Sequence, residues 1–372
     1  MINLKLYEIP ESKQIIVYHT GALGDLLVST AALFEVTNLF PRSKITLIGC
    51  SLWKEIILPL NWPNIDQIIV TNKNFNFFDI WKPCEQLLSW KQVKTQYSLR
   101  KILLNYSLSI DFRTESLRFA YQTFLAKIPI RIGASKSKLA KIFFTHFTLI
   151  KNKSEIHERD RYLRILSSIN ENYIEQKILF WEKNGLPSLK WFPKNHLQKN
   201  DKIKNILINP TASIREKAWC SSRFRELALK LKENSFNVKI IGSPKETSWL
   251  KEVALDDFEI IQPNTIIDLI DVVKQSHLLI TNTSSMQFIA AGTSTPTLTL
   301  MGSASPQRWG CLGQGSYSIK TEYKDIKIKK IFIRKKDIAK QKEVSAYNNI
   351  TVNLVLEKIN QLTKEPLKIK TL

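Results

Sequence analysis

The sequence has few cysteines, few glycines and no low-complexity tract. Its four cysteines, Cys50, Cys84, Cys220 and Cys311, lie far apart, so neighbouring cysteines cannot form a CxxC metal knuckle or a redox pair. We expect them to be reduced and mostly packed. The 11 glycines and 14 prolines are spread over 372 residues without a linker repeat. Nearly the whole chain is therefore expected to fold.

The sequence also lacks a long apolar run. No window approaches the roughly 18 apolar residues that a membrane helix requires. The first residues, MINLKLYEIPESKQ, have a charge or a proline in every short apolar stretch, unlike a signal peptide. We therefore expect neither secretion nor a membrane span, and predict a cytoplasmic protein.

Acidic residues are scarce relative to basic ones. There are 33 Asp and Glu against 55 Lys and Arg, a formal charge of +22. Such an excess predicts attraction to polyanions, which include nucleic acid, nucleotide phosphates and an anionic membrane surface. Residues 320–342 contain ten Lys or Arg and three Asp or Glu. This segment fits either a solvated amphipathic edge or a contact with a membrane or an anionic acceptor.

The chain is longer than one hydrophobic core usually organises, and 44% hydrophobic residues supply enough apolar surface for two. In a first domain, 1–183, short apolar runs alternate with helical periodicity. The expected strands are 15–18, 44–50, 67–70 and 106–112, and the expected helices are 26–40, 115–126 and 156–169. This alternation predicts a doubly wound parallel sheet.

A polar stretch with two prolines, 184–204, is the predicted inter-domain linker. The alternation resumes in a second domain, 205–345. Its expected strands are 205–209, 238–242, 258–262, 278–281 and 297–301, and its expected helices are 222–232, 246–255, 266–274 and one that begins near Ser284. A last helix at 349–362, within 346–372, is expected to pack near the domain junction. We expect both sheets to direct the carboxyl ends of their strands to a central cleft, where ligands bind in open α/β folds.

The loop after the first strand, His19 to Asp25, contains GxxG followed by aspartate and lacks the GxGxxG dinucleotide pattern. Its glycines, Gly21 and Gly24, allow a tight turn and a close approach to a ligand. Asp25 lies at a helix N-terminus, and at an ordinary pKa its carboxylate is ionised at neutral pH. It fits either a catalytic carboxylate or an ordinary helix cap.

Three further loops of the second domain are candidates for binding phosphates or a nucleoside. The loop at 210–219 has hydroxyls and cations suited to a diphosphate, with Ser213 as a donor and Lys217 as a point charge. The run 281–287 leaves unpaired N–H groups at a helix start. Glu246 suits ribose hydroxyls. A solvated turn, simple helix capping and a pairing with the helix dipole are the respective structural alternatives.

Taken together, these loops resemble glycosyltransferase family 9, the lipopolysaccharide heptosyltransferases. The resemblance rests on HTGALGDLLVSTAAL, IDFRTESLRFAY with PIRIG, HERDRYLRIL, INPTASIREKAW, IIGSPKE and TNTSSMQFIAAGTSTPTLTLMGSASP. It implies the GT-B fold, in which two Rossmann-like domains hold the acceptor and a nucleotide-activated sugar, usually ADP-heptose.

The resemblance assigns the catalytic base to Asp25. It implies donor binding by Thr211, Ser213, Lys217, Glu246, Asn282, Thr283, Ser284, Ser285 and Gln287. It implies acceptor binding by Gly21, Gly24, Arg113, Arg118 and Arg131. The three arginines suit this role because arginine pairs with sugar acids and phosphates. The donor loop departs from the family pattern, an Asp-Thr-Gly run with a histidine three residues later. This sequence has Asn282, Thr283, Ser284 and Gln287 at those positions.

We therefore predict an inverting glycosyltransferase that moves a heptose from ADP-heptose to an anionic, lipid-linked lipopolysaccharide inner-core acceptor at the inner face of the cytoplasmic membrane. We expect no metal site and no cofactor, since no DxD or carboxylate cluster lies near these loops. A different nucleotide-sugar donor is the alternative within the same fold. A basic nucleic-acid-binding protein is a remote alternative, opposed by the absence of a recognisable binding module.

Overall fold

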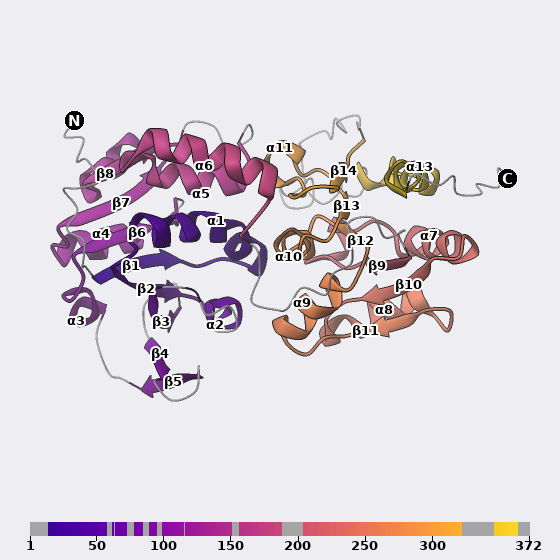
Figure 1. The fold of residues 1–372 in the computed structure, drawn as a ribbon, viewed down its shortest axis with the longest axis horizontal. Coiled ribbons are helices and arrows are strands. Elements are labelled where there is room, and N and C mark those ends of the chain that lie inside the picture. Colours follow the sequence, from indigo (N-terminus) through magenta and orange to yellow (C-terminus); the bar gives the residue numbers. More distant parts are fainter. Residues whose placement is uncertain are drawn as a thin grey trace, which may run out of the picture. The chain divides into compact units, whose positions relative to one another are not determined.

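The computed structural model describes residues 14–57, 62, 64–72, 78–84, 89–94, 99–114, 116–150, 156–187, 204–321 and 346–363. The chain divides into two compact units, Met1–Lys183 and Asn184–Leu372 (Figure 1). Most of the predicted linker, 188–203, and nearly all of the basic segment 320–342 lie outside the described residues. The roles of both segments therefore stay predictions.

The first unit is built on eight strands. They are β1 (Gln14–His19), β2 (Lys44–Gly49), β3 (Ile65–Thr71), β4 (Phe78–Cys84), β5 (Ser89–Lys94), β6 (Leu108–Asp111), β7 (Ile130–Ser135) and β8 (His146–Leu149). Its helices are α1 (Leu23–Leu39), α2 (Leu52–Ile57), α3 (Leu99–Leu103), α4 (Arg118–Leu125), η3 (Lys138–Phe143), α5 (Glu158–Ile165), η4 (Leu166–Ser168) and α6 (Glu171–Asn184).

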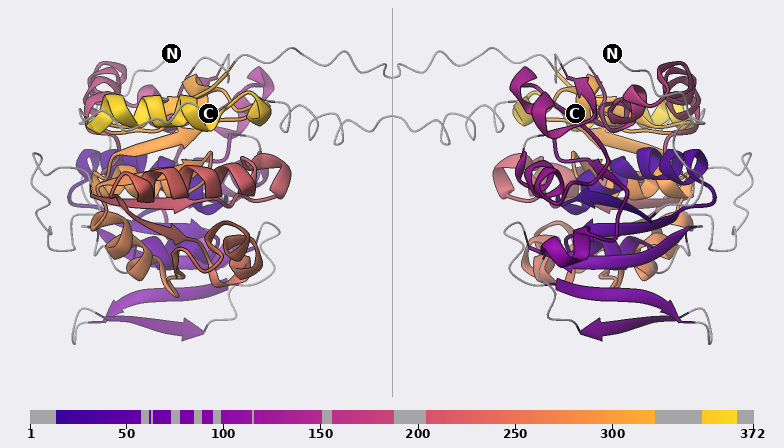
Figure 2. Two further views of the ribbon diagram at one scale, coloured as in Figure 1. Left: turned by 90° about the vertical axis from the view of Figure 1, so that its right-hand side faces the viewer. Right: turned by 90° about the vertical axis from the view of Figure 1, so that its left-hand side faces the viewer.

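These strands form one sheet in the order β5-β4-β3-β2-β1-β6-β7-β8. All neighbours pair in parallel except β3 with β4 and β4 with β5, which are antiparallel. The hairpin of β4 and β5 lies at one edge of the sheet (Figure 2). The central strands are buried on both faces and rich in Ile and Val, as is usual where helices cover both sides of a parallel sheet.

Alternating side chains of β1 face different helices. Ile16 and Tyr18 belong to a core with residues of α3 and α4. The ring of His19, an odd-numbered position, instead lies 5.0 Å from the ring of Tyr162 on α5. Helix α1 packs against α5. The helix that follows β1 and the helix that follows β6 therefore cover opposite faces of the sheet.

The second unit has the strands β9 (Asn205–Asn209), β10 (Asn237–Ile241), β11 (Glu259–Ile261), β12 (Leu278–Asn282), β13 (Thr297–Leu300) and β14 (Tyr317–Ile319). Its helices are η5 (Arg215–Lys217), α7 (Ser221–Glu233), η6 (Pro244–Glu246), α8 (Thr247–Ala254), α9 (Ile266–Lys274), α10 (Met286–Thr293), α11 (Pro306–Trp309) and α13 (Val352–Thr363). All its strands pair in parallel, in the order β11-β10-β9-β12-β13-β14.

This order is that of a dinucleotide-binding sheet, in which the winding reverses between the first and the fourth strand, here β9 and β12. Helices α7, α8 and α13 pack on one face, in a core that includes Ile206, Phe224, Leu250 and Val355. Helix α13 lies along α7 (Figure 2), so the C-terminal helix is part of the second unit's core. The other face carries α9 and α10, which pack together.

The predicted α/β fold class, with two doubly wound parallel-sheet domains, is confirmed. The details that differ from the sequence-based expectations include the following three. The antiparallel hairpin of β4 and β5 was not expected. The expected helix 156–169 ends as α5 at Ile165, and the 14-residue α6 closes the unit. Glu246 belongs to the short turn η6 that precedes α8. In the described part of the chain, no helix is long and apolar enough to cross a bilayer.

Candidate active site

The first candidate site lies where the winding of the first sheet reverses. Strands β1 and β6 are neighbours, and their following helices, α1 and α4, cover opposite faces. Ligands of open α/β sheets bind outside the carboxyl ends of the strands at such a point. Asp25 is in the first turn of α1, directly after β1. The fold therefore brings the predicted base to the expected ligand-binding edge.

A capping interaction orients the carboxylate of Asp25. Its Oδ2 accepts a hydrogen bond from the backbone N–H of Ala22 at 3.2 Å, so one oxygen caps α1. Gly21 lies directly against this side chain, since a Cβ at Gly21 would be 2.8 Å from the Asp25 Cβ. A larger residue at Gly21 would push the loop away from the carboxylate. Asp25 therefore does act as a helix cap, one of its two expected roles, and the cap leaves Oδ1 for other contacts.

Burial raises the pKa of Asp25 above its usual value. The Ala22 N–H opposes this shift, the nearby Glu158 carboxylate adds to it, and Arg113 and Arg161 lower the pKa again. The assumption of an ordinary pKa is therefore corrected, because the side chain is half-buried beside another carboxylate. A carboxylate of raised pKa is a stronger base than one in water.

His19 lies beneath the same loop and is fully buried. Burial lowers its pKa to about 3, so the imidazole is neutral. Its Nε2 lies 3.4 Å from the backbone oxygen of Asp25, and its Nδ1 has no hydrogen-bond partner among the described residues. The Trp53 Nε1–H donates to the His19 carbonyl at 2.9 Å. A Cβ at Gly49 would lie 1.9 Å from that carbonyl oxygen, so only glycine fits there.

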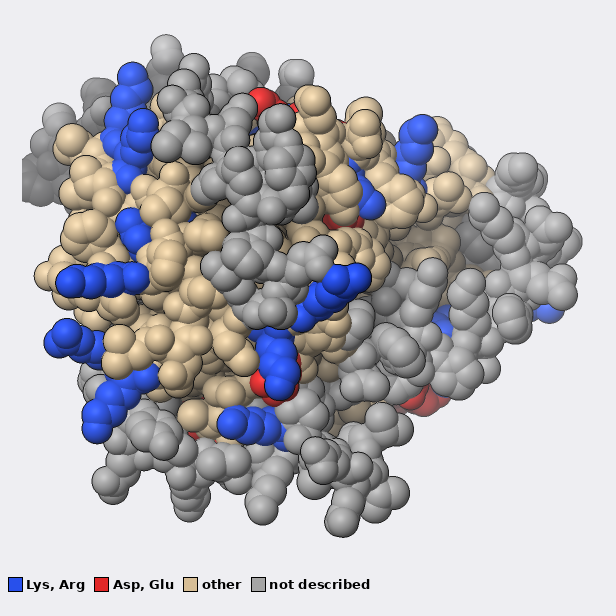
Figure 3. All heavy atoms as spheres, turned by 60° about the vertical axis from the view of Figure 1, so that its left-hand side comes forward, with Lys and Arg blue, Asp and Glu red and all other residues tan. Residues whose placement is uncertain are grey.

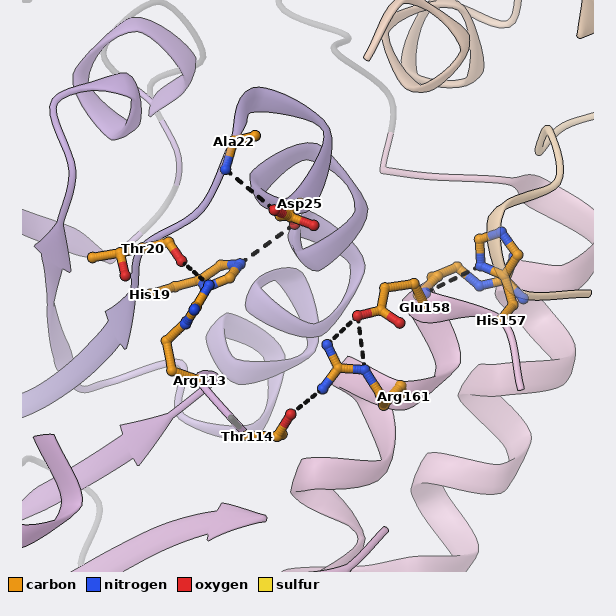
Figure 4. A network of polar contacts seen from close by, with 10 residues as sticks. His19, Thr20, Ala22, Asp25, Arg113, Thr114, His157, Glu158 and Arg161 are labelled. Atoms are coloured by element: carbon orange, nitrogen blue, oxygen red, sulfur yellow. Dashed lines mark hydrogen bonds and ion pairs between the residues drawn. The ribbon is translucent and has the colours of Figure 1, made fainter. Parts of the chain in front are cut away.

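The loop after β6 joins the β1 loop through Arg113. Its guanidinium donates to the Thr20 carbonyl at 2.6 Å, and its backbone N–H donates to Oδ1 of Asp111 at 2.8 Å. Asp111 is buried at the end of β6, and burial raises its pKa to about 8. Arg113 therefore ties the two loops together and brings a cation near Asp25, as Figure 4 shows.

Helix α5 contributes a buried ion pair that the sequence analysis did not single out. The Glu158 carboxylate accepts from Nε of Arg161 at 2.8 Å, and the other arginine nitrogens also reach Glu158 and the hydroxyl of Thr114. Figure 4 shows these side chains around the start of α1. HERDR at the start of a helix was the available clue, but its contact with Thr114 spans 47 residues of sequence.

The predicted acceptor residues are only partly brought together. Gly21, Gly24 and Arg113 are at the loop that carries Asp25. Arg118 begins α4 and is exposed. Arg131 is not at this edge: it pairs with Ser109 near the start of β6, at the amino end of the sheet, and its Nε donates to the Phe143 carbonyl at 2.8 Å. The polarity of β7 therefore separates Arg131 from Asp25.

The second unit has its own candidate site at the reversal between β9 and β12. Thr211 is buried after β9, and its hydroxyl accepts from the Asn209 amide at 3.1 Å. Ser213 and Lys217 are exposed in the same loop. Arg215, between them, pairs with Glu252, with nitrogen–oxygen distances of 2.5 and 2.7 Å. Lys217 is thus the cation of this loop that has no described ion-pair partner.

Asn282 supports this loop from the end of β12. It is fully buried, its Oδ1 accepts from the Trp219 N–H at 2.9 Å, and its Nδ2 donates to the carbonyls of Pro210 and Thr211 at 2.9 and 3.3 Å. All of these partners belong to the loop at 210–219 that follows β9. The structure therefore uses the Asn282 amide to hold the loop and commits it to protein groups.

The following residues lie at the N-terminal end of α10. The Ser284 hydroxyl accepts from the Met286 N–H at 3.3 Å, and Ser285 is the N-cap. Gln287 is fully buried and its Nε2 donates to the Trp309 carbonyl at 3.0 Å. Gln287 Oε1 and Thr283 Oγ1 are buried without a hydrogen-bond partner in the described residues. Buried polar groups are normally paired, so these two atoms are candidate ligand contacts.

Glu246 caps its own turn. Its Oε2 accepts from both the backbone N–H and the hydroxyl of Ser243 at 2.8 Å. Glu246 is therefore engaged within its own turn, although the side chain stays half-exposed at the carboxyl edge of β10. Among the residues that the structure describes, no three His, Cys, Asp or Glu side chains come together as a metal site.

Comparisons with known proteins agree with this architecture. The model of glycosyltransferase family 9 (heptosyltransferase) matches residues 97–336. A family 9 glycosyl transferase from Veillonella parvula is similar in structure, with TM-score 0.66 and 20% identity over 95% of this chain and 98% of that one. The ADP-heptose lps heptosyltransferase II of E. coli has TM-score 0.63 and 17% identity over 94% and 98%.

A third structure, E. coli heptosyltransferase WaaC with ADP, has TM-score 0.62 and 15% identity over 94% of this chain and 99% of that one. No curated protein matches this sequence. The family model covers well over half of the 372 residues, so the chain belongs to glycosyltransferase family 9. It is a heptosyltransferase-family glycosyltransferase with the GT-B fold, and the resemblance stated from the sequence is confirmed.

Proposed function

We propose that the protein transfers a heptose from ADP-heptose to an anionic, lipid-linked inner-core saccharide of lipopolysaccharide, with inversion and without a metal ion. The observation that carries this proposal is the placement of Asp25. This residue is a half-buried carboxylate of raised pKa at the reversal point of the first sheet, with one oxygen held by a cap. Solved structures of the family include complexes with ADP, which supports an ADP-linked donor.

The proposed reaction is a single displacement. Asp25 accepts the proton of an acceptor hydroxyl as that oxygen bonds to the anomeric carbon, and the bond from this carbon to the diphosphate breaks. The electron pair of the broken bond leaves with ADP, and the configuration inverts because attack and departure occur on opposite sides. General-base assistance of this kind commonly contributes about 10²–10⁴-fold in rate.

The charge on the leaving diphosphate is assigned to groups of the second unit. Lys217 is an exposed cation after β9, and α10 begins shortly after β12 with its N-terminal end, where the helix dipole favours negative charge. These groups stabilise developing charge without a metal ion. Thr283 and Gln287, each with an unpaired buried oxygen, are assigned to the donor's hydroxyls. Ser213 adds a hydroxyl in the same loop.

The acceptor and the location follow from charge. Arg113 places a guanidinium beside the Asp25 loop, where it can pair with a sugar acid or a phosphate of the acceptor. The net charge of +22 and the basic segment 320–342 favour peripheral contact with the anionic inner face of the cytoplasmic membrane. A lipid-linked acceptor is reached from that surface.

Substitution of Asp25 by Asn tests the proposal. We expect Asp25→Asn to lower kcat at least about a hundredfold, since basicity is lost, while donor affinity and melting temperature stay near wild type. Asn retains an acceptor oxygen for the cap. Asp268→Asn is a matched control, because Asp268 caps α9 in the same way, accepting from the Thr265 N–H at 3.2 Å. Near-native kcat for Asp25→Asn at saturating substrates would refute the assignment of Asp25 as the catalytic base.

A different nucleotide-sugar donor is the second candidate. It is favoured by Asn282 and Gln287, where the family pattern has an aspartate and a histidine. The Asn282 amide is committed to the β9 loop, so this edge lacks the carboxylate of the family pattern. Competition for binding between ADP-heptose and UDP- or GDP-sugars, measured by calorimetry, separates the two. Tighter binding of a UDP- or GDP-sugar would replace ADP-heptose as the donor.

A further inference from the structure

An apolar patch lies open on the first unit. It consists of Tyr121, Phe124 and Leu125 on α4 and Leu139 and Ile142 on η3, which pack against each other. Leu139 is 81% exposed and Ile142 is 66% exposed, so most of each aliphatic side chain is in contact with solvent. Soluble monomers rarely expose contiguous apolar surface without a use for it.

The helical spacing makes these side chains one surface. Tyr121, Phe124 and Leu125 follow an i, i+3, i+4 pattern on one side of α4. Leu139 and Ile142 are three residues apart in a 3₁₀ turn, so their side chains line up. Phe143 joins the two elements, with its ring centroid 5.9 Å from that of Tyr121 and 5.8 Å from that of Phe124.

The described residues in the part of the chain that carries this patch include many cations and almost no carboxylates. Among the described residues of 99–150 there are nine Lys or Arg and a single carboxylate, Asp111, which is buried at the end of β6. The exposed cations are Arg100, Lys101, Arg118, Lys127, Lys136, Lys138 and Lys141. Figure 3 shows Lys and Arg side chains gathered on this side of the molecule, where α3 and α4 lie.

We infer that the patch on α4 and η3 docks the protein on an anionic lipid surface. Leu139 and Ile142 insert at the boundary of headgroups and acyl chains, and Lys136, Lys138 and Lys141 contact lipid phosphates. Elements with apolar and aromatic side chains on one side and lysines around them bind membranes in this way. The inference rests on the membrane contact proposed above and assigns it to a surface outside the segment 320–342.

A second copy of the chain fits this patch less well. A twofold interface would bring the same surface of two molecules together, and would therefore set the lysines of one copy against those of the other. Like charges opposed in this way destabilise an interface. An anionic leaflet offers both an apolar layer for the patch and negative charge for its rim.

Vesicle co-sedimentation of the full chain tests the inference. Wild type should bind phosphatidylcholine vesicles that contain phosphatidylglycerol, bind pure phosphatidylcholine weakly, and dissociate as salt rises. Leu139→Glu should weaken binding at least about tenfold, since it replaces an inserting side chain with a charge. Leu179→Glu is the matched control on α6, where Leu179 is 61% exposed, and should bind as wild type does.

A charge series completes the test. Lys136→Gln, Lys138→Gln and Lys141→Gln should each weaken binding about fivefold. The triple variant of Lys44, Lys183 and Lys251 to Gln removes the same charge elsewhere and should bind far better than the triple variant of the patch. Melting temperature and donor affinity check that every variant is folded.

Three outcomes would count against the docking surface. If wild type binds anionic vesicles and the patch variants bind equally well, the patch is not the contact, although the membrane proposal stands. If wild type binds no vesicles at low salt, both fail. If light scattering shows a dimer that Leu139→Glu dissociates while vesicle binding is unchanged, a second copy is the occupant.

Discussion

At the scale of a single residue, Asp25 joins an observed helix cap with the proposed role of catalytic base. Its Oδ2 caps α1, in the same arrangement that Asp268 makes in α9, and in both cases the oxygen accepts from an N–H at 3.2 Å. The difference is the environment, because Asp268 is exposed and Asp25 is half-buried near Glu158 and two arginines. The cap fixes the carboxylate, and partial burial raises its basicity.

The raised pKa of Asp25 predicts a specific pH dependence. Below this pKa the carboxyl is protonated and cannot accept the acceptor's proton, so kcat/KM should fall on acidification, with a midpoint clearly above the usual 3.8 of aspartate. The pH profile of kcat/KM measures this limb. If this acidic limb is absent from the residual activity of Asp25→Asn, the limb belongs to the Asp25 carboxyl. A midpoint near 3.8, or an unchanged limb in the variant, would contradict the assignment.

At the scale of elements, a buried carboxylate attaches α1, the helix that carries Asp25, to α6. Glu35 is fully buried and accepts from the Tyr173 hydroxyl at 2.6 Å and the Trp181 Nε1–H at 2.8 Å, with Lys177 Nζ at 3.5 Å. The three partners come from one helix. Glu35 thus fixes the C-terminal part of α1, which is the end of the helix away from Asp25.

Removal of this carboxylate should be strongly destabilising. Glu35→Ala leaves a phenol, an indole N–H and an ammonium without their acceptor, so we expect the free energy of unfolding to fall by about 3–5 kcal/mol. Glu35→Gln keeps one acceptor oxygen and should lose less. Urea denaturation measures both, with the exposed Glu182→Ala on α6 as the control. A change under about 1 kcal/mol in Glu35→Ala would show that the helices are held otherwise.

A second element-scale prediction concerns Asn282. Asn282→Asp restores the residue of the family pattern, but it removes both donations to the Pro210 and Thr211 carbonyls and sets a buried carboxylate against those oxygens. We expect a loss of stability of about 1–3 kcal/mol or more. Chemical denaturation measures it against Asn237→Asp, an exposed control. Equal or greater stability of Asn282→Asp would show that the loop does not depend on this amide.

Periodicity predicted the regular elements well and the long-range contacts poorly. The bounds of β9 and α9 agree with the expected 205–209 and 266–274, because both have strong apolar patterns, and α9 has the Thr265 and Asp268 capping box. The β4–β5 hairpin escaped notice because it is a polar edge with Pro83 in a strand. Spacing along the chain could not show that Arg131 lies at the amino end of β7, nor that Arg161 on α5 reaches Thr114 across 47 residues of sequence.

At the scale of the whole molecule, the candidate groups are divided between two units with separate sheets and cores. Asp25, Arg113 and the buried pair of α5 belong to the first unit. Lys217 and the start of α10 belong to the second. If this division follows function, each substrate should stabilise one unit by itself.

ADP therefore should act on the second unit alone. A ligand that binds only folded protein stabilises it by about 2.7 kcal/mol at a hundred times its Kd, so amides whose exchange requires opening of the ADP site should slow markedly. We expect hydrogen exchange in 204–321 to slow, most strongly at 210–219 and 281–287, while exchange in the first unit, 14–183, stays unchanged. Lys217→Ala should weaken ADP about tenfold or more, because a charge-assisted hydrogen bond contributes about 1.5–3 kcal/mol. Lys251→Ala, an exposed lysine on α8, should not. Equal slowing in both units would contradict the division of roles, and unchanged protection in Lys217→Ala at limiting ADP would remove the lysine from the phosphate site.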